Sequence, residues 1–231
     1  MSTLVALDSQ KHQSLKLTTD KSFAHAKTRH LVPVAVHEFA MAATHLPIVF
    51  VKDSDTGQFR ACALTGLKPE QNLFWKDGGW LGAYVPESLR HYPLVALKVS
   101  EDGDSFAICI DEASPLVGRE TGEALFDGAN ASEFLNRRSE AAVAWAQKNL
   151  ITQSFIQRLI ELKLLQSRSL SIRPNSGAAY ELTGCYMIDE AALNRLDDQA
   201  FIGLKHGGYL APIYAALLSL NQVQSLVRLA Q

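Results

Sequence analysis

Apolar and polar residues alternate in short blocks along much of this chain, and the blocks predict β-hairpins. Each hairpin is a pair of runs of strand length joined by a short polar turn that contains glycine, an arrangement typical of antiparallel strands. The paired runs are residues 48–51 with 59–64, 94–99 with 105–110, and 168–172 with 180–188. Their turns are residues 53–57, 101–104 and 174–177.

Helical spacing of apolar residues appears between and after these hairpins. A short helix is predicted at 37–45, before Pro47, because proline disfavours helix in the residue that precedes it. Ser132 and Glu133 form a helix-start signal for the longest helix, which we expect to run to about residue 165 with a break at 149–152. Further helices are predicted at 189–196, 197–204 and 209–229.

Hairpins and helices alternate without the strand–helix–strand repeat that builds a parallel sheet. The sequence therefore predicts an α+β fold of antiparallel β-hairpins packed with helices, with a long helix in the middle and an apolar C-terminal helix. Residues 1–30 are polar and are predicted to form an N-terminal arm. Residues 31–231 are predicted to form a single α+β domain.

Composition narrows the class of protein. The 231 residues are 47% hydrophobic and 20% charged, as in ordinary globular proteins, and the net charge is −2. We therefore expect no nucleic-acid partner, which would require a basic surface. The N-terminus lacks the pattern of a signal peptide, and no run of 18 apolar residues occurs, so we expect a soluble cytoplasmic protein without a membrane span.

The three cysteines are widely spaced, and each lies in an apolar run: Cys62, Cys109 and Cys185. An odd number of isolated, apolar-flanked cysteines indicates buried reduced thiols rather than disulfides.

The stretch Gly78–Pro93 carries the most distinctive residues of the chain. Three glycines, two prolines, a histidine and several aromatic residues lie close together here, and Arg90 offers a donor for two parallel hydrogen bonds. This mixture is typical of a pocket for a small molecule, sugar or peptide. The candidate ligand-binding residues are Trp75, Trp80, Tyr84 and Arg90. The alternative is a rigid, packed loop in which Arg90 bonds main-chain carbonyls.

Candidates for catalysis are weaker. Asp111 and Glu112 end an apolar strand, and with His37 they would serve acid–base chemistry if the fold brought them together. His37 and His45 are eight residues apart, about 12 Å on a helix, which is too far for one metal ion. No motif for a cofactor or a metal appears, so we expect neither, and whether the protein is an enzyme stays open.

The last helix, residues 209–229, is apolar nearly all round. A helix of this kind is typically buried in a core, and the alternative is the seam of a homodimer.

Several short motifs in this order resemble the SapC-like family of proteobacterial proteins, named after a surface-layer-associated protein. They are LPIVF (46–50), ALTGL (63–67), NLF (72–74), WLGAYVP (80–86), LRHYP (89–93), ICIDE (108–112), GEALF (122–126), MIDE (187–190) and GGYLAPIYAALLSL (207–220). The resemblance covers roughly residues 30–225. It implies a bacterial protein often encoded near TonB-dependent receptors and tryptophan-halogenase-like proteins. It transfers no catalytic residue, and the transporter label of some members does not suit a chain without a predicted span.

Three hypotheses follow. The first is an accessory or ligand-binding protein of a nutrient-uptake or surface-assembly system, with no assembled catalytic set. The second is an enzyme with an acid/histidine site that acts on a small molecule or peptide. The third is a structural dimerisation module.

Overall fold

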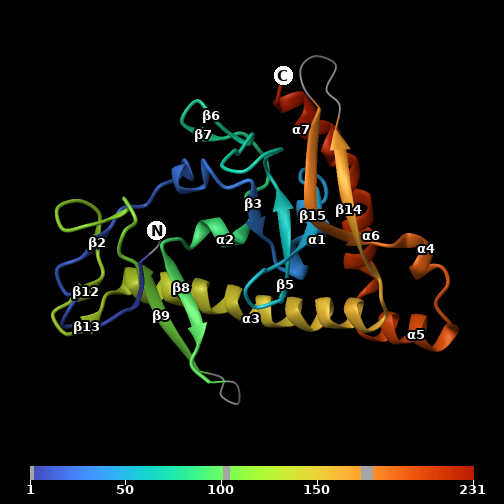
Figure 1. Cartoon of the computed structure of the whole chain (residues 1–231). Helices are drawn as coiled ribbons and strands as arrows, with labels where there is room; N and C mark the ends of the chain where they lie inside the picture. Colours follow the sequence, from blue (N-terminus) through green and yellow to red (C-terminus); the bar gives the residue numbers. More distant parts are fainter. Residues whose placement is uncertain (1–2, 101–104, 173–178) are drawn as a thin grey trace. The chain divides into compact units, whose positions relative to one another are not determined.

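The computed structural model describes residues 3–100, 105–172 and 179–231 (Figure 1). The chain divides into two compact units: unit 1 comprises residues 1–25 and 88–147, and unit 2 comprises residues 26–87 and 148–231. Residues 3–25 of the predicted arm therefore belong to unit 1, where their strands pair with later parts of the chain. The chain passes between the units within the 3-10 turn η1 (Ala24–Ala26), within the short helix α2 (Glu87–Arg90) and within α3 (Glu133–Glu161).

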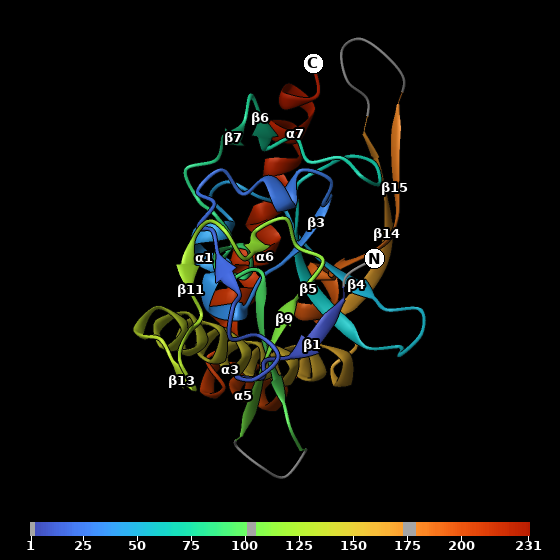
Figure 2. The ribbon, with the colours of Figure 1, turned by 90° about the vertical axis from the view of Figure 1, so that its left-hand side faces the viewer.

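Unit 1 is built on an antiparallel sheet in the order β1-β9-β8 (Figure 2). Its strands are β1 (Leu4–Ala6), β8 (Leu94–Lys98) and β9 (Phe106–Asp111), and the β8–β9 pair is the predicted second hairpin. The turn predicted at 101–104 lies outside the described residues. Smaller ladders join β2 (Lys16–Leu17), β10 (Val117–Gly118) and β11 (Glu123–Ala124), and also β12 (Phe126–Asp127) and β13 (Asn130–Ala131).

One face of this sheet packs against α3. Because side chains alternate across a strand, the even-numbered residues of β8 and β9 share that face. Ala96 meets Ala142 and Ala146 of α3, and small side chains there allow helix and sheet to approach closely. Leu94 and Ile110, both 0% exposed, form a second cluster on the same face with Leu125.

Unit 2 contains the larger sheet, in the order β14-β15-β4-β5-β3. Its strands are β3 (Leu31–Pro33), β4 (Ile48–Lys52), β5 (Phe59–Leu64), β14 (Leu165–Ile172) and β15 (Tyr180–Ile188). The hairpins predicted at 48–64 and 168–188 are confirmed as β4–β5 and β14–β15. The turn predicted at 174–177 lies outside the described residues.

Helices of unit 2 supply the rest of its core. Beside the second half of α3 these are α1 (Phe39–Ala42), α4 (Glu190–Leu193), α5 (Asp198–His206), α6 (Leu210–Ser219) and α7 (Val223–Leu229), with the 3-10 turns η2 (Val36–Glu38) and η3 (Leu220–Gln222). Phe39, Phe50 and Phe155 are fully buried, with ring centroids 5.8–6.4 Å apart, and they join the sheet to α1 and α3.

The predicted break in the long helix is wrong, because α3 is continuous from Glu133 to Glu161. Thr152 satisfies its hydroxyl within the helix by donating to the Lys148 carbonyl at 2.8 Å, and it accepts the Val36 N–H at 2.8 Å. The helix begins as predicted, with the Leu135 N–H bonded to Oγ of Ser132. It ends earlier than expected, where Lys163 adopts φ 54° and the chain turns into β14.

The apolar C-terminal segment forms α6, η3 and α7. Residues Leu210–Leu229 are long and apolar enough to cross a membrane by length and composition. A window of 18 residues within them has a mean hydropathy of 1.2, and 22% of that window is buried. Ser219, 0% exposed, links the segment to the sheet, since its Oγ accepts the Ile48 N–H at 2.8 Å and donates to the Ala216 carbonyl. Leu218 is 66% exposed, so the segment has one buried and one open side.

Candidate functional site

The aromatic stretch begins with a small hairpin in unit 2, made by β6 (Trp75–Lys76) and β7 (Gly79–Trp80). Asp77 and Gly78 occupy the turn with φ of 53° and 83°, the two positive angles that a type I′ turn requires. The register pairs Trp75 with Trp80. Directly opposed residues lie on the same face of an antiparallel ladder, so the two tryptophans share one side of the hairpin.

Trp80 is held in place on both its apolar and its polar side. Its ring stacks on Phe74, with centroids 5.8 Å apart and an interplanar angle of 22°. Its Nε1–H donates to the Tyr84 carbonyl at 2.9 Å. Gly82 makes room for this bond, because a Cβ at that position would lie 2.7 Å from Nε1 of Trp80.

Tyr84 is anchored by a buried carboxylate. Its hydroxyl donates to Oε1 of Glu38 at 2.5 Å, and the Glu87 N–H donates to the same oxygen at 2.7 Å. Oε2 of Glu38 accepts the Ala35 N–H at 2.9 Å. Glu38 is 3% exposed, and these bonds compensate the desolvation of its charge. The carboxylate thus ties the aromatic loop to η2.

The other candidate ligand residues lie in different surroundings. The Trp75 ring is half-buried, with the exposed Lys27 ammonium 5.1 Å from its centroid, a distance typical of cation–π contacts. Arg90, at the end of α2, is exposed and belongs to unit 1. The structure therefore brings Trp75, Trp80 and Tyr84 together in one unit and assigns Arg90 to the other.

The acidic pair lies in unit 1, where Asp111 is largely buried at 7% exposure. Its Oδ1 accepts the N–H groups of Thr3 at 2.9 Å and Ala113 at 3.3 Å, and its Oδ2 accepts the Tyr92 hydroxyl at 3.1 Å. Asp111 thereby connects Thr3, just before β1, to the end of β9.

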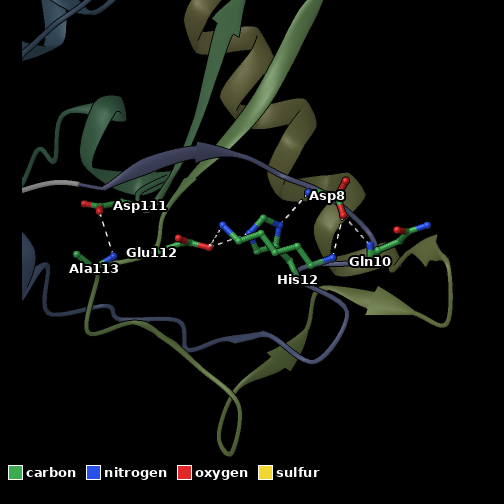
Figure 3. A network of polar contacts seen from close by, with 7 residues as sticks. Asp8, Gln10, His12, Asp111, Glu112 and Ala113 are labelled. Atoms are coloured by element: carbon green, nitrogen blue, oxygen red, sulfur yellow. Dashed lines mark hydrogen bonds and ion pairs between the residues drawn. The ribbon is translucent and has the colours of Figure 1, made fainter.

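Glu112 points the other way and meets the chain after β1 (Figure 3). Its Oε1 lies 2.9 Å from Nζ of Lys11 and 2.9 Å from Nε2 of His12. His12 is 1% exposed, and its Nδ1 accepts the Asp8 N–H at 2.8 Å, which assigns the ring proton to Nε2. The hydrogen bonds from Lys11 and then from His12 lower the pKa of Glu112.

This network is suited to holding the fold rather than to moving protons. The histidine is enclosed, and both of its ring nitrogens are bonded. His37, the third residue of the proposed acid/histidine site, is exposed in η2 and belongs to unit 2, whereas Asp111 and Glu112 belong to unit 1. Across the described parts of the chain, no group of three or more histidine, cysteine, aspartate or glutamate residues is placed to hold a metal ion.

The thiols are confirmed as free and buried. Burial raises the pKa of Cys62 to about 12, and it also raises the pKa of Cys109 and Cys185. At neutral pH such groups stay protonated and are poor nucleophiles.

Sequence reasoning missed Glu38, His12 and the hairpin of Trp75–Trp80. The hairpin carries a local signal, the dipeptide Asp77-Gly78 between two aromatic residues, which favours a two-residue turn. His12 and Glu38 carry none, because their partners Glu112 and Tyr84 are distant in sequence and only folding brings them near.

Comparison with known proteins agrees with the motifs quoted above. The family model described as SapC matches residues 7–226, nearly the whole chain. Searches of the curated proteins and of the solved structures find no match. The match runs through both units and includes the aromatic hairpin and the Asp111–Glu112 pair. The chain therefore belongs to the SapC family.

Proposed function

We propose that this protein is a binding protein, an accessory component of a nutrient-uptake or surface-assembly system, whose ligand face is the Trp75–Trp80 hairpin. The observation that carries the proposal is the way the loop is anchored. The polar atoms of Trp80 and Tyr84 bond within the protein, to the Tyr84 carbonyl and to Glu38, while the Trp75 and Trp80 rings stay half-exposed.

A fixed, half-exposed aromatic surface binds ligands that present a flat apolar face at low entropic cost. Sugar rings and the side chains of short peptides have such faces. Lys27 beside Trp75 adds a cation that favours ligands with oxygen acceptors. Arg90 belongs to the other unit, and the proposal does not require it.

Tryptophan fluorescence tests this proposal directly. The chain has three tryptophans, so Trp145→Phe leaves only the hairpin pair as reporters. This variant is titrated with chitotriose, with maltotriose and with the tripeptide Gly-Phe-Gly. We expect saturable quenching by at least one probe, lost when Trp75→Ala is added and kept when the exposed neighbour Lys76→Ala is added instead. Equal quenching after Trp75→Ala, or no quenching by any probe, contradicts the proposal.

A second candidate is a self-associating module, and it is favoured by the open side of α6 and α7. Tyr214 and Leu218 lie four residues apart on α6 and are 44% and 66% exposed. A second copy of the chain would bury these side chains. Sedimentation at increasing concentration should then show a dimer that Leu218→Glu dissociates. A monomer at every concentration contradicts this candidate.

A further inference from the structure

Unit 1 contains a groove of about 350 Å³ between β9 and one face of α3. Its lining is apolar where Phe106 and Ile108 of β9 meet Val143 and Ala144 of α3. The remaining lining residues are polar and lie along the same face of the helix: Asn136, Ser139, Glu140 and Gln147. The groove is open to solvent.

β9, the strand beside this groove, is paired with β1 over part of its length. β1 pairs with β9 only from Leu4 to Ala6, opposite Asp111 to Cys109. The Leu7 N–H adds a last bond to the Ile108 carbonyl at 2.8 Å. The chain then turns away at Asp8, whose Oδ1 accepts the N–H groups of Gln10 and Lys11.

The hydrogen bonds of neighbouring residues show toward which side of β9 the N–H and C=O groups of Phe106 point. The Asp111 N–H donates to the Pro93 carbonyl, and the Val99 N–H donates to the Ser105 carbonyl. Odd-numbered residues of β9 therefore bond to β8, and even-numbered residues face the β1 side. The N–H and C=O of Phe106 thus point to the side where β1 has ended. Among the described residues, no strand pairs with Phe106 there.

We propose that this groove binds an extended peptide segment, which adds to β9 at Phe106 and lies along α3. An extended main chain carries a donor and an acceptor at the spacing of the open edge, which a rigid small molecule does not reproduce. Alternate side chains of the segment point into the apolar lining, because the side-chain period of a strand is two.

The charge of the lining defines the preferred peptide. Glu140 is exposed, and it is the one charged side chain among the lining residues that the structure describes. A basic residue next to the apolar anchors would pair with it, whereas an acidic residue would be repelled. The partner is therefore an extended segment that alternates β-branched apolar residues with lysine or arginine. This site lies in unit 1 and is independent of the hairpin in unit 2.

Binding is measured on the full chain by fluorescence anisotropy with three labelled octapeptides. The first alternates valine and lysine, the second alternates valine and glutamate, and the third is the valine–lysine peptide with the main-chain nitrogen of every valine methylated. We expect saturable binding of the first, at least about tenfold weaker binding of the second, and a loss of about tenfold or more for the third. Equal affinity for the first and third peptides overturns the strand-addition geometry.

Two variants locate the site. Ala144 is exposed, so Ala144→Trp should fill the groove without unfolding α3, and it should abolish binding of the valine–lysine peptide. Glu140→Gln should retain binding but reduce the preference for lysine over glutamate. The control is Glu133→Gln, an exposed acid on the same helix outside the lining, which should change neither property. Unchanged binding in Ala144→Trp, or no binding of any peptide by the wild-type chain, overturns the proposal.

Discussion

The Tyr84 hydroxyl donates a 2.5 Å hydrogen bond to Oε1 of Glu38, a carboxylate 46 residues earlier that is 3% exposed. This single contact connects the aromatic loop with the turn η2, and the Glu87 N–H strengthens it by donating to the same oxygen.

Replacing the two partners should have unequal effects. Tyr84→Phe removes one bond to a charged acceptor and should lower the free energy of unfolding by about 2 kcal/mol. Glu38→Ala leaves the Tyr84 hydroxyl and two N–H groups without their acceptor and should cost about 4 kcal/mol. Urea unfolding followed by circular dichroism measures both. A larger loss for Tyr84→Phe than for Glu38→Ala would show that the carboxylate is not the anchor.

Gly82 should be required for the position of Trp80. Gly82→Ala places a Cβ within 2.7 Å of Trp80 Nε1 and 3.3 Å of Phe74, so the indole must shift and lose its bond to the Tyr84 carbonyl. We expect a red-shifted tryptophan emission and weaker near-ultraviolet circular dichroism. Gly79→Ala is the matched control, because its Cβ would meet no atom within 4 Å. The same spectral change in both variants would refute the steric explanation.

The stability of the protein should fall in acid partly through Glu112. In the folded protein the pKa of Glu112 lies below the ordinary value of 4.5, because the hydrogen bond from Lys11 and, second in size, the one from His12 favour the charged carboxylate. Glu112 therefore contributes its full share of the folding stability at pH values above its pKa in the unfolded chain. This contribution is lost as the pH falls below 4.5 and through the lower pKa that Glu112 has in the folded protein. Glu112→Gln should be less stable than the wild type at pH 6, and the difference should shrink toward pH 3. A difference that is constant with pH would exclude this linkage.

The thiols should resist modification while the protein is folded. Cys62, whose pKa burial raises to about 12, and the buried Cys109 and Cys185 should react with an aromatic disulfide reagent only as the chain opens. We expect little colour in the native protein and three equivalents in guanidinium, in accordance with the three cysteines of the chain. Rapid release of one equivalent from native protein would reveal an accessible thiol.

Local sequence patterns were sufficient for most of the secondary structure. The hairpins at 48–64 and 94–110 have apolar runs of strand length around polar turns, and Ser132 alone encodes the cap at the start of α3. The first strand of the third hairpin was predicted from residue 168, whereas β14 begins at Leu165. The continuity of α3 was not readable in this way. Thr152 looks like a helix breaker until its tertiary contact with Val36 is known.

Sequence alone determined the α+β class, the helix positions and the family, because these depend on residues close together in the chain or on motifs in a fixed order. Which polar groups meet depends instead on how distant parts of the chain fold together. Glu38 with Tyr84, and His12 with Glu112, are pairs separated by 46 and 100 residues, and no local pattern encodes such a distance. The open edge of β9 also depends on residues that are distant in the sequence, because β1 ends at Ala6, opposite Cys109, and does not reach Phe106.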